Sequence, residues 1–250
     1  INDLWNQATR FLIFASDQSK DKEILFNVLI CLLNNVCAFK SKQLETNIQK
    51  IVDNITKGSQ CQNQKVLSLV SNVIQNMDSK EMIVDLFKKN FVENLIKNVK
   101  TKTAMNQSVK ILALFTQNNS KNFRKMIIQI DKNLEFLYQI FKDVSQTPDQ
   151  PNTGNKILNL KKLNEVAISN AVLCMSNCVE SDDKLAERLL KTDIIMDLLY
   201  LTRDGYNIDL QKNCGILIAK LAKKDQRHLL RLRELNGVEI LYAALKNTNI

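Results

Sequence analysis

Apolar and polar positions follow a helical period along almost the whole chain. Five runs are apolar on most of their circumference, which is typical of buried helices. These runs are Ile24–Phe39, Val66–Met77, Ser108–Thr116, Val166–Val179 and Cys214–Ala222. Between them, short amphipathic segments are predicted at Glu81–Lys89, Phe123–Ile130, Lys184–Lys191 and Gln226–Leu235, each followed by a second apolar segment at Val92–Val99, Leu134–Phe141, Ile194–Leu201 and Val238–Leu245. The pattern predicts a recurring order of short amphipathic helix, medium helix and long buried helix.

The last two units superpose residue by residue. Residues 170, 171, 173 and 178 align with residues 213, 214, 216 and 221 at an offset of 43, and Thr192–Ile194 aligns with Asn236–Val238 at an offset of 44. A three-helix period of about 40–47 residues is that of armadillo and HEAT repeats. The sequence therefore predicts an all-α, right-handed, armadillo-type superhelical solenoid of about five repeats. Gly237 falls where such repeats place a turn glycine.

One spacing breaks the period. The interval between the long runs that contain Phe115 and Cys178 exceeds one repeat by about 20 residues, which matches the stretch 143–162. That stretch contains both prolines of the chain, Pro148 and Pro151, together with Gly154. We predict a surface loop inserted into a single solenoid over residues 1–250, because the helical pattern resumes at Leu163. The alternative is a boundary between two domains at this stretch.

Composition supports a helical fold and narrows the function. Gly 5 and Pro 2 are few for a turn-rich β fold or a Gly-rich nucleotide-binding fold, and no run approaches the about 20 apolar residues of a membrane span. The net charge is +9, but the lysines are scattered and aromatic residues make up only 6%. A nucleic-acid surface would be expected to interleave basic and aromatic residues, so nucleic acid is the least favoured partner.

Catalytic and metal sites find little support in the sequence. His228 is the single histidine, and it lies among charged residues, where an exposed, ordinary histidine is expected. Cys174 and Cys178 share a helix face, but with no histidine nearby they are expected to be buried core thiols and not half of a metal site. We therefore predict no catalytic residue, no metal, no cofactor and no small-molecule substrate.

Armadillo arrays bind partners along a concave groove lined by the third helix of each repeat, often with an asparagine near its end. Asn35, Asn72 and Asn177 occur in that frame, and Leu114 and Lys220 occupy the same frame in the other two units. Together with positions four and eight residues earlier, the frame predicts a protein-binding groove that contains Asn27, Asn35, Gln64, Ser68, Asn72, Asn106, Lys110, Ser169, Asn177, Lys212 and Lys220. Its amides and lysines favour an extended acidic segment.

The densest basic cluster lies near the end of the chain. It consists of Lys223, Lys224, Arg227, Arg231 and Arg233. The simpler interpretation is a solvated repeat face; the functional alternative is a surface for an acidic protein segment.

The second half of the chain resembles a specific family. The segments LCMSNC, LLKTDIIMDLL and LRELNGVEIL, and before them VKILALFTQN and IIQIDKNLEFLYQIF, are similar to the C-terminal armadillo array of cytoplasmic dynein-arm assembly factors that also carry tetratricopeptide repeats. The resemblance implies a non-catalytic protein-binding scaffold in the cytoplasm, or in the cilium and axoneme. The implied partners are dynein arm subunits and assembly co-factors or chaperones. The alternatives are a structural axonemal or trafficking scaffold and a nucleic-acid-binding helical array.

Overall fold

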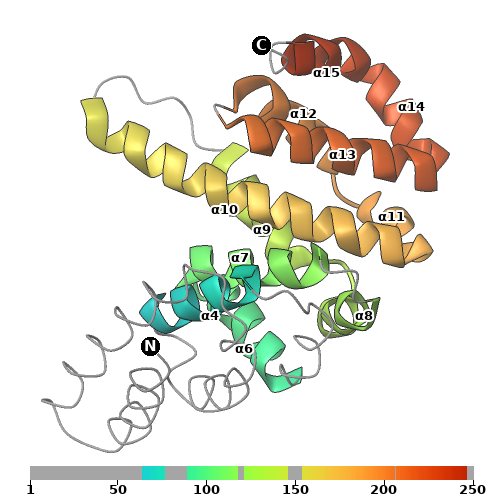
Figure 1. The fold of residues 1–250 in the computed structure, drawn as a ribbon. Helices are drawn as coiled ribbons and strands as arrows, with labels where there is room; N and C mark the ends of the chain where they lie inside the picture. The colour runs from blue at the N-terminus through green and yellow to red at the C-terminus, as the bar shows by residue number, and fades with distance from the viewer. Residues whose placement is uncertain (1–63, 77–88, 118–120, 146–153, 206, 247–250) are drawn as a thin grey trace, which may run out of the picture. The chain divides into compact units, whose positions relative to one another are not determined.

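The computed structural model describes residues 64–76, 89–117, 121–145, 154–205 and 207–246. Within these ranges the chain forms eleven helices and no strand (Figure 1). The helices are α4 (Gln64–Asn76), α6 (Lys89–Lys100), α7 (Met105–Gln117), α8 (Lys121–Ile130), α9 (Glu135–Ser145), α10 (Gly154–Ser181), α11 (Asp183–Leu189), α12 (Ile194–Asp204), α13 (Ile208–Lys224), α14 (Gln226–Glu234) and α15 (Gly237–Lys246). The chain divides into two compact units, Ile1–Asn118 and Asn119–Ile250.

In the first unit α7 packs against both α4 and α6. The apolar stripes of these helices are buried, and the rings of Phe91 and Phe115 meet edge to face with centroids 6.5 Å apart. The Asn98 side chain in α6 donates a buried hydrogen bond of 3.3 Å to Ser108 Oγ in α7. The predicted runs Val66–Met77, Val92–Val99 and Ser108–Thr116 are thus helical where described, whereas Ile24–Phe39 lies outside the described residues.

The second unit repeats a three-helix motif. Helices α8, α9 and α10 form one repeat, α11, α12 and α13 form the next, and α14 and α15 occupy the first two places of a third. The long helices α10 and α13 run side by side (Figure 1), and α13 also packs against α12 and α14. Short side-chain caps begin the helices of this unit: Asp182 caps α11, Asn207 caps α13 and Asp225 caps α14, each by accepting from main-chain N–H groups of the first turn.

The predicted surface loop at residues 143–162 is too long. Helix α9 continues to Ser145, and α10 already begins at Gly154, so 154–162 is helical. Of the stretch 143–162, residues 146–153 are the part that the structure does not describe. The reason is that Pro151 is the last proline, and no residue between Gly154 and Ser181 forces a helix to stop. The excess over one repeat is therefore largely extra helix at the start of α10.

Candidate protein-binding surfaces

The predicted groove residues of the first unit lie on two packed helices. Gln64, Ser68 and Asn72 follow one face of α4, while Asn106 and Lys110 follow one face of α7. Asn106 is exposed and Lys110 is half-buried, and this burial lowers the pKa of the Lys110 ammonium group. Asn27 and Asn35 lie outside the described residues.

In the second unit, the predicted groove residues of α10 are mostly covered. Ser169 is 7% exposed and Asn177 is 8% exposed. The side-chain nitrogen of Asn213 in α13 donates to Ser169 Oγ at 3.0 Å and to the Ser169 carbonyl oxygen at 3.3 Å. Ser169 is therefore part of the contact between two repeats, and the sequence analysis missed Asn213, which makes that contact.

The two predicted groove lysines of α13 differ from each other. Lys212 is exposed, whereas Lys220 Nζ donates to Glu180 Oε2 at 3.1 Å and to the Ser176 carbonyl oxygen at 3.4 Å. The hydrogen bond from Lys220 lowers the pKa of Glu180. Glu180 of the preceding repeat therefore neutralises Lys220.

Exposed apolar side chains accompany Lys212. Ile216, one turn after Lys212, is 47% exposed, and Val166 on the neighbouring α10 is 50% exposed. The described surface of α10 and α13 therefore combines these apolar side chains with the exposed cation of Lys212. Ile216 and Val166 are apolar residues inside otherwise buried helical runs, so their exposure could not be predicted from the pattern.

Most residues of the basic cluster form ion pairs with carboxylates of the protein itself. Lys224 pairs with Asp183, Arg227 Nη2 lies 3.5 Å from Glu187 Oε1, and Arg231 Nη2 lies 3.1 Å from Asp193 Oδ2. The Arg227 and Arg231 pairs join the last repeat to the preceding one, whereas the Lys224 pair joins α13 to α11 within one repeat.

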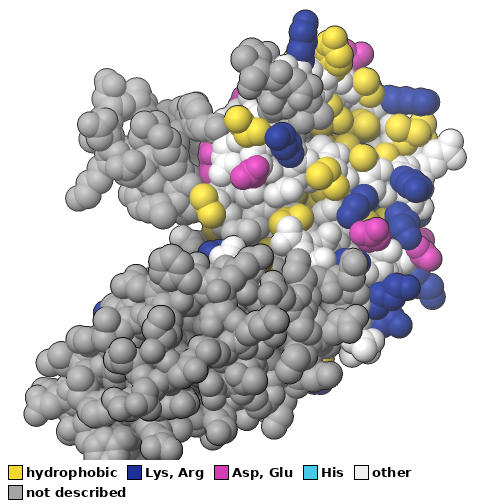
Figure 2. Space-filling model, viewed as in Figure 1, with side chains coloured by type: hydrophobic (Ala, Val, Ile, Leu, Met, Phe, Trp, Pro, Cys, Tyr) yellow, Lys and Arg dark blue, Asp and Glu magenta, His cyan; other side chains and the backbone are white. Residues whose placement is uncertain are grey.

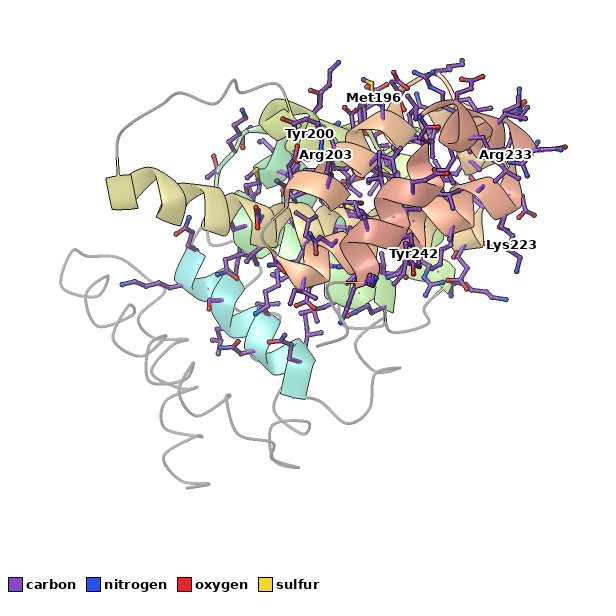
Figure 3. All side chains as sticks on the ribbon, turned by 90° about the horizontal axis from the view of Figure 1, so that it is seen from above. Met196, Tyr200, Arg203, Lys223, Arg233 and Tyr242 are labelled. Atoms are coloured by element: carbon purple, nitrogen blue, oxygen red, sulfur yellow. The ribbon has the colours of Figure 1, made fainter. Side chains whose placement is uncertain are left out.

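Lys223 and Arg233 are the exposed members of this cluster without an ion pair in the described part of the chain. Figure 3 shows both residues at one end of the molecule, and in Figure 2 dark blue basic side chains lie beside yellow apolar ones over this C-terminal part.

His228 is buried, contrary to the expectation of an exposed histidine. It is 1% exposed, and its Nε2 lies 2.8 Å from the Ala186 carbonyl oxygen. The physical reason is the repeat register: at the offset of 43, His228 takes the place of Leu185, which is 0% exposed. The charged neighbours of His228 point away from the core. Their charge therefore does not indicate that His228 itself is exposed.

The described cysteines lie in the core. Cys174, Cys178 and Cys214 are free thiols with 0% exposure, and burial raises the pKa of Cys214 to about 12. The residues described contain no group of three or more His, Cys, Asp or Glu side chains placed to hold a metal ion. Within the same ranges, none of the helices is both long and apolar enough to cross a membrane.

Comparison with known proteins supports both the fold and the sequence resemblance. The chain is 31% identical over 171 residues to human tetratricopeptide repeat protein 12, and 32% identical over 148 residues to the mouse protein. It resembles tetratricopeptide repeat protein 12. The matched regions comprise 67% and 59% of this chain but only 21% and 18% of those proteins, so the chain spans about a fifth of the length of the relatives it matches. No protein-family model matches the chain.

Solved structures confirm the predicted fold class. A designed armadillo repeat protein superposes with a TM-score of 0.64 at 12% identity, covering 96% of this chain and 90% of its own. An engineered protein from a structural genomics consortium superposes with a TM-score of 0.66 at 13% identity, covering 97% and 90% of the two chains. The chain is an all-α, armadillo-type repeat protein.

Proposed function

We propose that the chain is a non-catalytic protein-binding scaffold that acts in the assembly of ciliary dynein arms. The observation that carries this proposal is the resemblance to tetratricopeptide repeat protein 12 over two thirds of the chain, in a fold whose stacked helices form an extended binding surface. The proposed partners are dynein arm subunits, assembly co-factors or chaperones. The proposed location is the cytoplasm, with the cilium or axoneme as the alternative.

The binding surface is proposed to be the exposed side of the long helices. Lys110 on α7 and Lys212 on α13 carry positive charge, and Ile216 and Val166 add exposed apolar area in the second unit. In the second unit an extended acidic segment fits such a surface, since its carboxylates would meet Lys212 and its apolar side chains would meet Ile216 and Val166. Lys110 would contribute to a separate surface of the first unit. Lys220 is excluded from this role because Glu180 already neutralises it.

The nucleic-acid alternative finds little support in the described residues. Lys224, Arg227 and Arg231, three of the five basic residues near the end of the chain, are paired with carboxylates of α11 or of the turn before α12. Phosphate contacts would have to compete with these pairs.

The test is affinity capture from an extract of ciliated cells, with dynein heavy chains quantified by mass spectrometry. The wild-type chain is expected to capture them, and the variant Lys110→Glu with Lys212→Glu is expected to lose most of the capture. The matched control is Lys125→Glu with Lys191→Glu, which makes the same change in charge at two exposed lysines, one on α8 and one in the turn between α11 and α12. Equal losses in both variants would contradict the assigned surface, and no capture by the wild type would contradict the assembly role.

A structural axonemal role predicts a different distribution. A permanent axonemal scaffold should co-sediment with demembranated axonemes and resist extraction, whereas an assembly factor should remain in the cytosolic fraction. Fractionation of ciliated cells followed by immunoblotting separates the two.

A further inference from the structure

The described part of the first unit carries almost only positive charge. Glu93 is its one acidic residue, and the carboxylate pairs with Lys89, whose Nζ lies 3.6 Å from Glu93 Oε1. In the second unit, by contrast, carboxylates accompany the cations, as in the pairs Arg188–Asp182 and Arg203–Asp204. The charged side chains of the described first unit are Lys65, Lys89, Lys97, Lys100, Lys102, Lys110 and Glu93, which gives six lysines against one glutamate.

Three of these lysines gather where α6 ends and the chain turns into α7 (Figure 1). Lys97 and Lys100 lie in the last turn of α6, three residues apart and therefore neighbours on the helix surface, and Lys102 follows in the turn. All three side chains are exposed, and we call them the lysine turn. Lysines in a last turn also oppose the negative end of the helix dipole. That effect explains Lys97 and Lys100, but Lys102 lies beyond the helix.

The main chain holds the lysine turn in a defined conformation. The Lys102 N–H donates to the Val99 carbonyl oxygen at 3.1 Å, and the Thr103 N–H donates to the Asn98 carbonyl oxygen at 2.9 Å. These two bonds are the pattern of a Schellman helix end. The Asn98 side chain also donates to Ser108 Oγ of α7, so the end of α6 is tied to the next helix. The three lysines are therefore carried by a fixed frame.

Lys102 occupies the position of this helix end that glycine most often fills. Its φ is 57°, in the left-handed region, where a Cβ strains the main chain and glycine does not. A glycine would end α6 with less strain. A role for the charge of Lys102 accounts for a lysine at this exposed position, whereas the helix end by itself does not.

The surroundings of the lysine turn restrict the chemistry of a partner. Its exposed neighbours Thr101, Thr103 and Asn106 are polar and uncharged, and the rings of Phe91 and Phe115 are buried. Among the described residues, the large apolar side chains that are exposed all belong to the second unit, and the first unit has no arginine. Base stacking, insertion into a membrane and bidentate phosphate binding are therefore all disfavoured here.

We propose that the lysine turn binds an acidic, unstructured segment of a partner protein, rich in glutamate or aspartate and poor in apolar residues. The ammonium groups of Lys97, Lys100 and Lys102 would attract its carboxylates as hydrated point charges. Such binding depends strongly on salt, because exposed charges are screened. It uses only the first unit and needs no apolar contact, so it is distinct from the surface proposed on α10 and α13.

The probe is a fluorescently labelled hexaglutamate peptide, and hexaglutamine with the same label is the uncharged control. In anisotropy titrations at low ionic strength, hexaglutamate is expected to bind the 250-residue chain, whereas hexaglutamine is not. The affinity is expected to fall at least about tenfold when the ionic strength rises from about 0.01 M to about 0.15 M.

Two double variants locate the binding. Lys97→Gln with Lys100→Gln is expected to weaken hexaglutamate binding at least about fivefold. The matched control is Lys65→Gln with Lys89→Gln, which removes the same charge from exposed lysines of the same unit and is expected to weaken binding less than about twofold. Lys212→Glu is expected to leave hexaglutamate binding unchanged, so failure here and failure of the surface proposed on α10 and α13 are distinguishable.

Lys102→Gly separates a role in binding from a role in the helix end. Glycine removes the charge and relieves the main chain at a φ of 57°. The thermal midpoint is therefore expected to stay the same or rise, while hexaglutamate binding weakens about two- to threefold. A lower midpoint with unchanged binding would show that Lys102 serves the helix end alone, and this result would contradict the proposal.

Three further outcomes would overturn the proposal. Absence of hexaglutamate binding at low ionic strength would remove the surface, unless a DNA duplex or phosphatidylserine vesicles bind and lose binding in Lys97→Gln with Lys100→Gln. That result would assign the lysine turn to a phosphate-bearing partner and reject the acidic segment. Equal losses in the two double variants would show an effect of net charge alone, and a loss in Lys212→Glu would place the peptide on α13. Circular dichroism checks that each variant is folded.

Discussion

The His228 ring in α14 contacts the main chain of the preceding repeat: its Nε2 lies 2.8 Å from the carbonyl oxygen of Ala186 in α11. A carbonyl oxygen only accepts hydrogen bonds, so Nε2 carries the proton and donates it. The ring is 1% exposed and occupies the position that Leu185 has one repeat earlier. His228 therefore combines a core position with a polar link between repeats.

We expect His228→Ala to lower the free energy of unfolding by about 2 kcal/mol, because it opens a cavity and leaves the Ala186 carbonyl oxygen without its donor. His228→Gln should lose less, since its amide can still donate. Urea unfolding followed by circular dichroism measures both variants. Equal stability of His228→Ala and the wild type would show that the hydrogen bond and the packing of the ring contribute nothing.

The fold was predictable because its signal is periodic. The four long apolar runs from Val66 onward form α4, α7, α10 and α13. The two runs that align at an offset of 43 residues form α10 and α13, and these two helices pack against each other. Such patterns report burial averaged over a helix. They do not report which individual position is covered by a neighbouring repeat, and the burial of Ser169 and the exposure of Ile216 were therefore not predicted.

The ion pairs between repeats have a signal in the sequence: residues of opposite charge lie about one repeat apart. Glu187 and Asp193 precede Arg227 and Arg231 by about one repeat, and the structure joins each pair across the repeat boundary. Asp183 and Lys224 also pair, but within one repeat, between α11 and α13. Opposite charges separated by one repeat period are therefore a usable signal of stacking. Charge at the surface could be counted from the sequence, but its neutralisation depended on this pairing.

We expect Arg231 to contribute more to the stability of the folded state than its exposed neighbour Arg233. Arg231 makes contacts of 3.1 and 3.2 Å to both carboxylate oxygens of Asp193, whereas Arg233 has no ion pair among the described residues. Arg231→Glu is expected to lower the thermal midpoint by a small but measurable amount, because it replaces an ion pair by two like charges, whereas Arg233→Glu should change the midpoint little. The exchange Asp193→Arg with Arg231→Asp should restore part of the loss. Identical midpoints for the two single variants would argue that the pair with Asp193 does not form in solution.

Because Asp225 caps α14, we expect the stability of this helix to depend on pH in the acidic range. Its carboxylate accepts from the Arg227 N–H at 2.9 Å and pairs with the Arg227 guanidinium at 2.7 Å, and these contacts lower the pKa of Asp225 to about 2 from 3.8. A lowered pKa in the folded state means that the stabilisation is complete above pH 3.8 and is lost as the pH falls through 2.

Two variants of Asp225 test this dependence. Asp225→Ala is expected to cost about 1 kcal/mol at neutral pH through loss of the helix cap, and the difference from wild type should shrink toward pH 2. Asp225→Asn keeps an acceptor for the N–H group, so it should retain most of the cap and show less loss of stability in acid. A constant difference between wild type and Asp225→Ala at all pH values would contradict the ionised cap.

Gly237 is required for close packing and not for a left-handed turn. The residue with positive φ between α14 and α15 is Asn236, at 49°, so the turn that the sequence analysis assigned to Gly237 belongs to its neighbour. A Cβ at Gly237 would collide with Cδ1 of Leu232 and lie 2.9 Å from Cδ1 of Leu199. Both leucines are nearly buried, at 5% and 3% exposure.

We expect Gly237→Ala to destabilise the chain by about 1 kcal/mol, because the cost of overpacking exceeds the gain in helix propensity. Leu232→Ala removes the side chain that the new Cβ would meet. In that background Gly237→Ala should therefore cost less or become stabilising, and a double-mutant cycle in urea measures the difference. A turn role would give another pattern: Gly237→Ala would cost the same in both backgrounds, because backbone strain does not depend on Leu232. Asn236→Val supplies the comparison, since a β-branched residue is strained at a φ of 49° whether or not Leu232 is present.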